Sequence, residues 1–230
     1  MSQTARPSHT PPTDLLQTEV WVFDLDNTLY SGVHGLFEQI DARMCGFLAQ
    51  FLDIDEGEAH RVQKSYFREY GTTLRGMMLN HAMDPKAYLD YVHDIDVSAI
   101  PSAPDLGAAL ERLEGRKLIF TNADTAHAER VLARLGIANH FDAIFDIVES
   151  QYIPKPEPEI YTTMVKRFAI DPPKAVMVED IARNLKPAAH LGMTTVWVRP
   201  ITECAVSKEA PDGDHVDFET DDLVAWLQAL

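Results

Sequence analysis

Asp24 directly follows the apolar run Val20–Phe23, and a second aspartate, Asp26, stands two residues later. The run is rich in β-branched and aromatic residues, which predicts a strand buried on both faces, as in the middle of a parallel sheet. Side chains at positions i and i+2 of a strand point to the same side, so the two carboxylates are expected to converge. Such charges repel unless a cation lies between them, and a hard divalent ion, most simply Mg²⁺, suits carboxylate oxygens. The alternative is a turn whose Asp and Asn side chains bind only the local backbone.

A second apolar run, Leu118–Phe120, ends in Thr121 and Asn122, and Asp124 is placed to cap the helix that follows. A hydroxyl group and free backbone amides at a strand-to-helix turn can bind phosphate. Such turns are also commonly rich in Thr, Asn and Asp for purely local reasons. The turn is therefore a candidate phosphate site only in combination with other groups.

A lysine and a second acidic pair complete the candidate set. Lys155 lies between two prolines in an acidic protein, which makes it a candidate fixed cation. Glu179 and Asp180 follow a third buried strand, Ala175–Val178, with Asn184 one helical turn later. Taken singly, the lysine could be solvated and the acids could simply complement a helix dipole. Together they indicate one site, because open α/β sheets bind ligands at the carboxyl ends of their strands.

The elements that must position these residues alternate between helix and strand in the second half of the chain, which predicts a parallel α/β sheet. Residues 35–100 carry four amphipathic helical patterns, far more than one crossover between parallel strands needs. We therefore expect a discontinuous α/β core, residues 19–34 and 101–230, with residues 35–100 inserted as an all-helical cap. Residues 1–18 are expected to form a disordered tail, and the acidic segment 207–222 is expected to form a loop.

Composition limits the partners and the compartment. The 230 residues carry a formal net charge of −16, which argues against nucleic acid and anionic membranes as partners. The sequence has no apolar run long enough to cross a bilayer and no signal-peptide h-region. Cys45 and Cys204 imply no disulfide framework, so a reducing cytoplasm is the expected compartment.

The candidate groups resemble, in content and order, the four signature elements of the haloacid dehalogenase superfamily of phosphatases. They read Asp24-Leu25-Asp26-Asn27-Thr28, Thr121-Asn122, Lys155-Pro156 and Glu179-Asp180. The resemblance covers residues 20–199 and implies a Rossmann-like core with the Asp24 strand at its centre and the helical insert as the cap. It therefore implies a small phosphomonoester as the substrate.

The resemblance also implies a role for each group. Asp24 would be the nucleophile and Asp26 the acid/base. Mg²⁺ would be held by Asp24, the backbone carbonyl of Asp26 and Asp180, with Glu179 assisting. Phosphate would bind Thr121 and Asn122, and Lys155 would neutralise the nucleophile and the phosphoryl oxygens. Asn184 stands where some branches carry another acid, so we expect only a supporting role for it.

The chemistry of these residue types agrees with that reading. A carboxylate can attack a metal-bound phosphoryl group and form an aspartyl-phosphate, which splits one hard step into two. Asp26 can protonate the departing oxygen and later accept a proton from the attacking water. Dehalogenases of the superfamily lack this acid/base aspartate, so Asp26 favours reaction at phosphorus over reaction at carbon.

A narrower resemblance is to the pyrimidine 5′-nucleotidase branch, and it implies substrates such as UMP, CMP or dUMP. It is carried by residues 24–30, by Tyr70-Gly71-Thr72-Thr73-Leu74-Arg75-Gly76 and by Thr121-Asn122-Ala123, although Ser31 replaces an expected proline. It implies that Tyr70 and Arg75 face the substrate, whereas helical spacing alone makes Arg75 a solvated residue. The alternatives are a phosphatase or mutase for a sugar phosphate or other metabolite, and a non-catalytic binding protein. The intact set of acids and lysine counts against the last.

Overall fold

The computed structural model describes residue 15 and residues 17–200 and 211–230 of the chain. Its described strands form a six-stranded, entirely parallel sheet in the order β3-β2-β1-β4-β5-β6. The strands are β1 Val20–Phe23, β2 Arg116–Phe120, β3 Ala143–Phe145, β4 Ala175–Glu179, β5 Thr194–Val198 and β6 Phe218–Thr220. This is the predicted Rossmann-like α/β fold.

The first strand lies in the middle of the sheet, as predicted. All four residues of β1 are buried, and Val22 is in register with Leu118 of β2 and Met177 of β4. Since all strands run in the same direction, the residues that follow β1, β2 and β4 reach the same edge of the sheet. The topology thus brings together the segments that follow Phe23, Phe120 and Glu179, which are far apart in the sequence.

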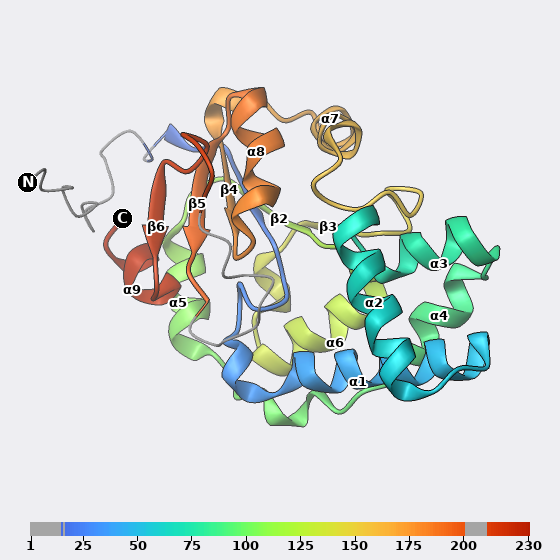
Figure 1. Ribbon diagram of the computed structural model, residues 1–230. Coiled ribbons are helices and arrows are strands. Elements are labelled where there is room, and N and C mark those ends of the chain that lie inside the picture. The colour runs from blue at the N-terminus through green and yellow to red at the C-terminus, as the bar shows by residue number, and fades with distance from the viewer. Residues whose placement is uncertain (1–14, 16, 201–210) are drawn as a thin grey trace, which may run out of the picture.

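Helices cover both faces of the sheet (Figure 1). One hydrophobic cluster includes side chains of α5, α6 and α9, and the cluster on the other face includes side chains of α7 and α8. These helices are α5 Pro104–Arg112, α6 Thr125–Leu135, α7 Pro158–Arg167, α8 Ala182–Leu191 and α9 Leu223–Gln228. The two buried clusters hold the strands rigidly, and with them the groups at the strand ends.

The four helices of residues 35–100 gather beside the sheet (Figure 1) and share a hydrophobic cluster of their own. They are α1 Leu36–Leu52, α2 Glu56–Tyr70, α3 Thr73–His81 and α4 Pro85–Val92. Side-chain caps from Asp55, Thr72 and Asp84 begin three of them, and Gly71, with φ of 83°, ends α2. Residues of these types are typical start and stop signals of helices. We refer to this unit as the helical insert.

Three expectations differ from the structure in detail. Leu15 belongs to the tail predicted to be disordered, yet it is buried in a core cluster, where hiding its apolar side chain from water offsets the entropy of ordering. Residues 1–14 and 16 of that tail lie outside the described residues. The sequence also predicts a short strand over 143–148, and in the structure this strand ends at Phe145. The segment 207–222 contains β6, because pairing with β5 satisfies its backbone; its residues 207–210 are not described.

None of the helices in the described part of the chain has the length and apolar character needed to cross a membrane.

Candidate active site

A buried lysine joins two of the predicted acidic groups. The Nζ atom of Lys155 lies 2.7 Å from Asp24 Oδ1, 2.6 Å from Glu179 Oε2 and 2.9 Å from the carbonyl oxygen of Phe120. The side chains of Lys155 and Glu179 are each 1% exposed. Burial alone would lower the pKa of Lys155, but the charges of Asp24 and Glu179 raise it above its ordinary value. Lys155 is therefore a fixed positive charge at the end of the central strand.

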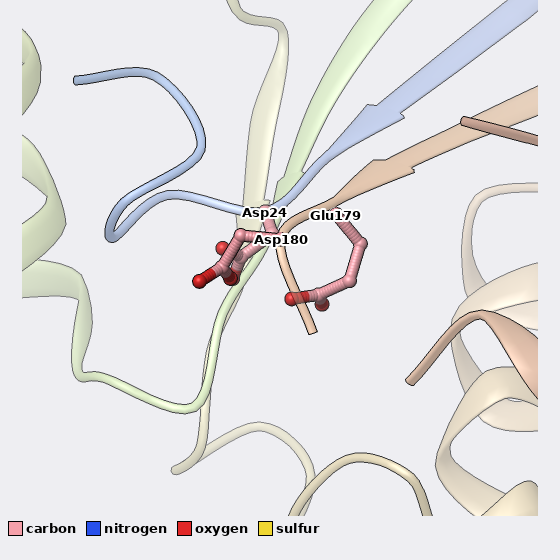
Figure 2. A group of neighbouring side chains, drawn as sticks. All are labelled: Asp24, Glu179 and Asp180. Atoms are coloured by element: carbon pink, nitrogen blue, oxygen red, sulfur yellow. The ribbon is translucent and has the colours of Figure 1, made fainter. Parts of the chain in front are cut away.

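Three carboxylates meet where β1 and β4 end (Figure 2). Asp24, Glu179 and Asp180 each offer an oxygen within 4.8 Å of the others, and all three residues are buried. Burial and the charge of Glu179 raise the pKa of Asp24 to about 7, even though Lys155 acts in the opposite direction. The excess of buried negative charge and the oxygen-only donor set both fit a hard divalent cation such as Mg²⁺.

The carboxylate of Asp26 lies in a separate network. Its Oδ1 atom accepts a hydrogen bond from the hydroxyl of Tyr30 at 2.6 Å and lies 2.9 Å from Nε2 of His127. Burial alone would raise the pKa of Asp26, but His127 and the Tyr30 hydroxyl lower it to about 2. Asp26 lines the same cavity as Asp24, so both can act on one bound molecule. Its side chain does not belong to the three-carboxylate cluster.

The predicted phosphate residues lie at the same strand ends. Thr121 Oγ1 accepts the backbone N–H of Ala123 at 3.0 Å, which leaves its own hydrogen free to donate to a ligand. Asn122 Oδ1 accepts the backbone N–H of Lys155 at 2.8 Å and thereby holds the lysine loop in place. Asn184, buried on α8, lines the cavity with them. The structure thus brings the site residues predicted outside the insert to one cavity, which is lined by Asp24, Asp26, Thr121, Asn122, Lys155, Glu179, Asp180 and Asn184.

The helical insert covers this site and forms the far wall of the cavity. Its contribution is mainly apolar, through residues such as Phe37, Ile40, Met44, Phe67 and Leu89. The insert also contributes a polar trio to the lining, made of Asp41, Gln63 and Lys64. Gln63 Nε2 donates to Asp41 Oδ1 at 2.8 Å, Lys64 Nζ lies 2.6 Å from the same oxygen, and Gln63 Oε1 is buried without a partner in the described structure.

The two insert residues predicted to face the substrate do not line this cavity. The ring of Tyr70 packs on the ring of Tyr66, with centroids 5.6 Å apart, and Arg75 lies in the first turn of α3. The motif that suggested them has a structural explanation: Gly71 ends α2, Thr72 caps α3, and a Cβ atom on Gly76 would lie 2.4 Å from Tyr66. Backbone demands of the turn therefore account for much of the motif.

Sequence reasoning missed His127, His93 and the polar trio of the insert. Nothing in the spacing of Gln63, Asp41 or His93 connects them to the motifs, because each reaches the site from a different helix. His127 had a weak signal. It follows the predicted helix cap Asp124 by three residues and so lies in the first turn of the helix, near the strand end.

Comparison with known proteins gives one family. The sequence model of the haloacid dehalogenase-like hydrolase family matches residues 18–192, which are three quarters of the chain. Phosphate metabolism protein 8 of Saccharomyces cerevisiae is 31% identical over 194 residues, which cover 76% of this chain and 60% of that protein. The chain therefore spans about 60% of the length of this relative.

Two further relatives are phosphatases. Fructose-1-phosphate phosphatase YqaB of Escherichia coli is 32% identical over 83 residues, covering 35% of this chain and 43% of that protein. The crystal structure of a HAD phosphatase from Thermococcus onnurineus has the same fold, with a TM-score of 0.62, 20% identity and coverage of 92% of this chain and 96% of that one.

Proposed function

We propose that this chain, which belongs to the haloacid dehalogenase-like hydrolase family, is a Mg²⁺-dependent phosphomonoester hydrolase. The observation that carries the proposal is the contact between the Lys155 ammonium and Asp24 Oδ1, at 2.7 Å, beside the acidic cluster at the end of the central strand. A buried nucleophilic carboxylate with a fixed cation at one oxygen suits attack on a phosphoryl group.

The protein groups divide the reaction between them. Asp24 attacks phosphorus and forms an aspartyl-phosphate, while the bond from phosphorus to the ester oxygen breaks. Asp26, in the same cavity, must enter this step protonated, although its neighbours favour the ionised form. It gives that oxygen a proton and later accepts one from the water that hydrolyses the intermediate. Lys155 and the Thr121 hydroxyl stabilise negative charge on the transferring group.

Asp24 and Asp180 would hold Mg²⁺ through side-chain oxygens, and Asp26 through its backbone carbonyl. Bound there, the ion would neutralise charge on the phosphoryl oxygens and orient the ester. Chelation should therefore stop turnover and added Mg²⁺ should restore it. Hydrolysis that resists chelators would contradict the metal assignment.

For the leaving group we propose a nucleoside, so that the substrate is a nucleoside 5′-monophosphate. Nucleotides with a pyrimidine base are the preferred candidates. Support comes from the cavity wall, which is mainly apolar and suits a flat base better than a polyol. Gln63 adds selectivity. Its Nε2 is committed to Asp41, so its Oε1 remains as a buried acceptor for one N–H group of the base.

A sugar phosphate is the second candidate, for hydrolysis or for phosphoryl transfer between positions of the sugar. It is favoured by the similarity to fructose-1-phosphate phosphatase. A polyol would need several hydrogen-bond partners on the insert. Besides the trio around Gln63, the lining there offers the polar side chains of Thr72, Thr73, Tyr88 and His93.

A phosphate-release screen over nucleoside monophosphates and sugar phosphates tests the proposal. We expect kcat/KM for UMP or CMP to exceed that for ribose 5-phosphate. Gln63→Met, of nearly equal size, should lower kcat/KM for the nucleotide about tenfold, the effect of one lost hydrogen bond, and leave ribose 5-phosphate unaffected. Gln50→Met, on the exposed side of α1, is the matched control. A preference for sugar phosphates that Gln63→Met leaves unchanged would support the second candidate instead.

A further inference from the structure

The carboxylate of Asp26 is held on one side only. Tyr30 donates to Oδ1 at 2.6 Å, and His127 Nε2 lies 2.9 Å from the same atom. Oδ1 accepts the Tyr30 hydroxyl and remains an acceptor when Asp26 carries its proton on Oδ2, so His127 donates to it from Nε2. Both contacts of described residues with this carboxylate fall on Oδ1, which leaves Oδ2 for a molecule in the cavity that Asp26 lines.

The imidazole of His127 has no other hydrogen bond in the described structure that would explain its presence. Its side chain is 0% exposed, and Nδ1 is buried without a partner. A buried ring nitrogen left unpaired is unfavourable, so an apolar side chain would fill this space better. The contact with Asp26 is the feature that an apolar residue could not supply.

The backbone and the ring of His127 are both fixed by their neighbours. Its N–H donates to Asp124 Oδ1 at 2.8 Å, at the start of α6. The ring of His93, which ends α4 of the helical insert, stacks on the His127 ring with centroids 4.5 Å apart and planes 22° apart. His93 Nδ1 lies 3.2 Å from Asp124 Oδ2. The insert therefore supplies one face of the packing around His127.

We propose that His127 is the positioning residue of Asp26: with Tyr30 it fixes Oδ1, so that Oδ2 faces the ester oxygen of the substrate, and His93 of the insert holds the imidazole in place. This inference rests on the proposed phosphoester hydrolysis, in which Asp26 is the acid. It makes protonation of the leaving group depend on the helical insert being packed against α6.

The test uses leaving groups that differ in their need for a proton. An alkyl phosphomonoester such as a nucleoside monophosphate needs protonation of its departing oxygen, whereas para-nitrophenolate leaves without it. The value of kcat/KM reports phosphoryl transfer to Asp24, the first irreversible step, and is insensitive to the later hydrolysis. His127→Asn moves the amide away from Oδ1, while His127→Gln can place an N–H where Nε2 was.

We expect His127→Asn to lower kcat/KM for the alkyl ester by about 30- to 100-fold, within the range of general acid catalysis, and for para-nitrophenyl phosphate by less than about threefold. His127→Gln should recover most of the alkyl activity. Tyr30→Phe, which removes the other donor to Oδ1, should give the same selective loss even if the buried histidine variants fold poorly. His190→Asn, on the exposed side of α8, is the control.

An equal loss for both esters, or no loss for either, in the folded variants would overturn the positioning role. A wild-type protein that hydrolyses neither ester overturns the proposed function itself, and this inference with it.

Discussion

Glu179 binds protein groups with both of its carboxylate oxygens. Oε2 lies 2.6 Å from Lys155 Nζ, and Oε1 accepts the backbone N–H of Ile181 at 3.1 Å. Asp24 binds the same lysine with Oδ1 and accepts a hydrogen bond from Thr28 with Oδ2. We infer that Glu179 serves the site by holding Lys155 and the backbone of Ile181.

At this scale the sharpest prediction concerns Asp24→Asn. The amide keeps the shape of the side chain but cannot form an acyl phosphate, so kcat should fall by at least about 10³-fold. Stability should change little, because the variant removes one of several crowded negative charges. Phosphate release and thermal unfolding measure the two effects.

Asp90→Asn, at an exposed ion pair of the helical insert, is the control and should keep full activity. Retained activity in Asp24→Asn would remove this residue from the mechanism.

At the scale of single elements, helix α6 connects the sheet to the helical insert. Asp124 caps this helix, because its Oδ1 accepts the backbone N–H of His127. Its Oδ2 lies 3.2 Å from Nδ1 of His93, at the end of α4. One N-cap residue thus fixes both histidines. The same helix begins one turn after Thr121, so its placement also sets the geometry of the Thr121-Asn122 turn.

The charge on Asp124 predicts a pH dependence of stability. Burial alone would raise its pKa, but the hydrogen bond and charge of His93 and the N–H of His127 lower it below the ordinary value of 3.8. A lowered folded-state pKa contributes stability that is present above the unfolded-state pKa and lost as pH falls through the folded-state value.

Asp124→Asn keeps a capping side chain but not the charge. The free energy of unfolding, measured by urea titration, should therefore be lower for the variant at pH 6, and the difference should shrink below about pH 4. Asp124→Ala, which also loses the cap, should cost about 1 kcal/mol more. A difference that stays constant between pH 6 and pH 3 would contradict the role of the charge.

For the whole molecule, the site is a joint product of the sheet and the helical insert. Asp24, Asp180 and Lys155 lie at the carboxyl edge of the sheet, and the insert closes the cavity over them. Ile147, which follows β3, packs in the hydrophobic cluster of the insert and so ties the two parts together. Ligands bound at this edge should therefore stabilise the molecule as a unit.

Magnesium should raise the melting temperature. A ligand at about a hundred times its Kd stabilises the folded state by about 2.7 kcal/mol, which corresponds to about 5–10 °C for a chain of this size. Asp180→Asn should abolish most of the shift, while the exposed Asp171→Asn should retain it. Thermal unfolding with and without Mg²⁺ measures this without any assay of activity. An undiminished shift in Asp180→Asn would place the ion elsewhere.

Local sequence determined the elements and the strand-end residues of this protein. Buried β-branched runs define β1 and β4, and caps such as Asp84 and glycines such as Gly71 define helix ends, because these preferences act over a few neighbouring residues. Parallel strands then carry Asp24, Thr121 and Asp180 to a common edge whatever the intervening chain contains.

Tertiary structure decided what surrounds Asp26 and what faces the leaving group. The contact of His93 with His127, and the lining of the cavity by Gln63 in place of Tyr70 and Arg75, depend on how whole helices pack. Packing is set by the fit of many side chains from distant segments, so the spacing of residues within one helix does not reveal it.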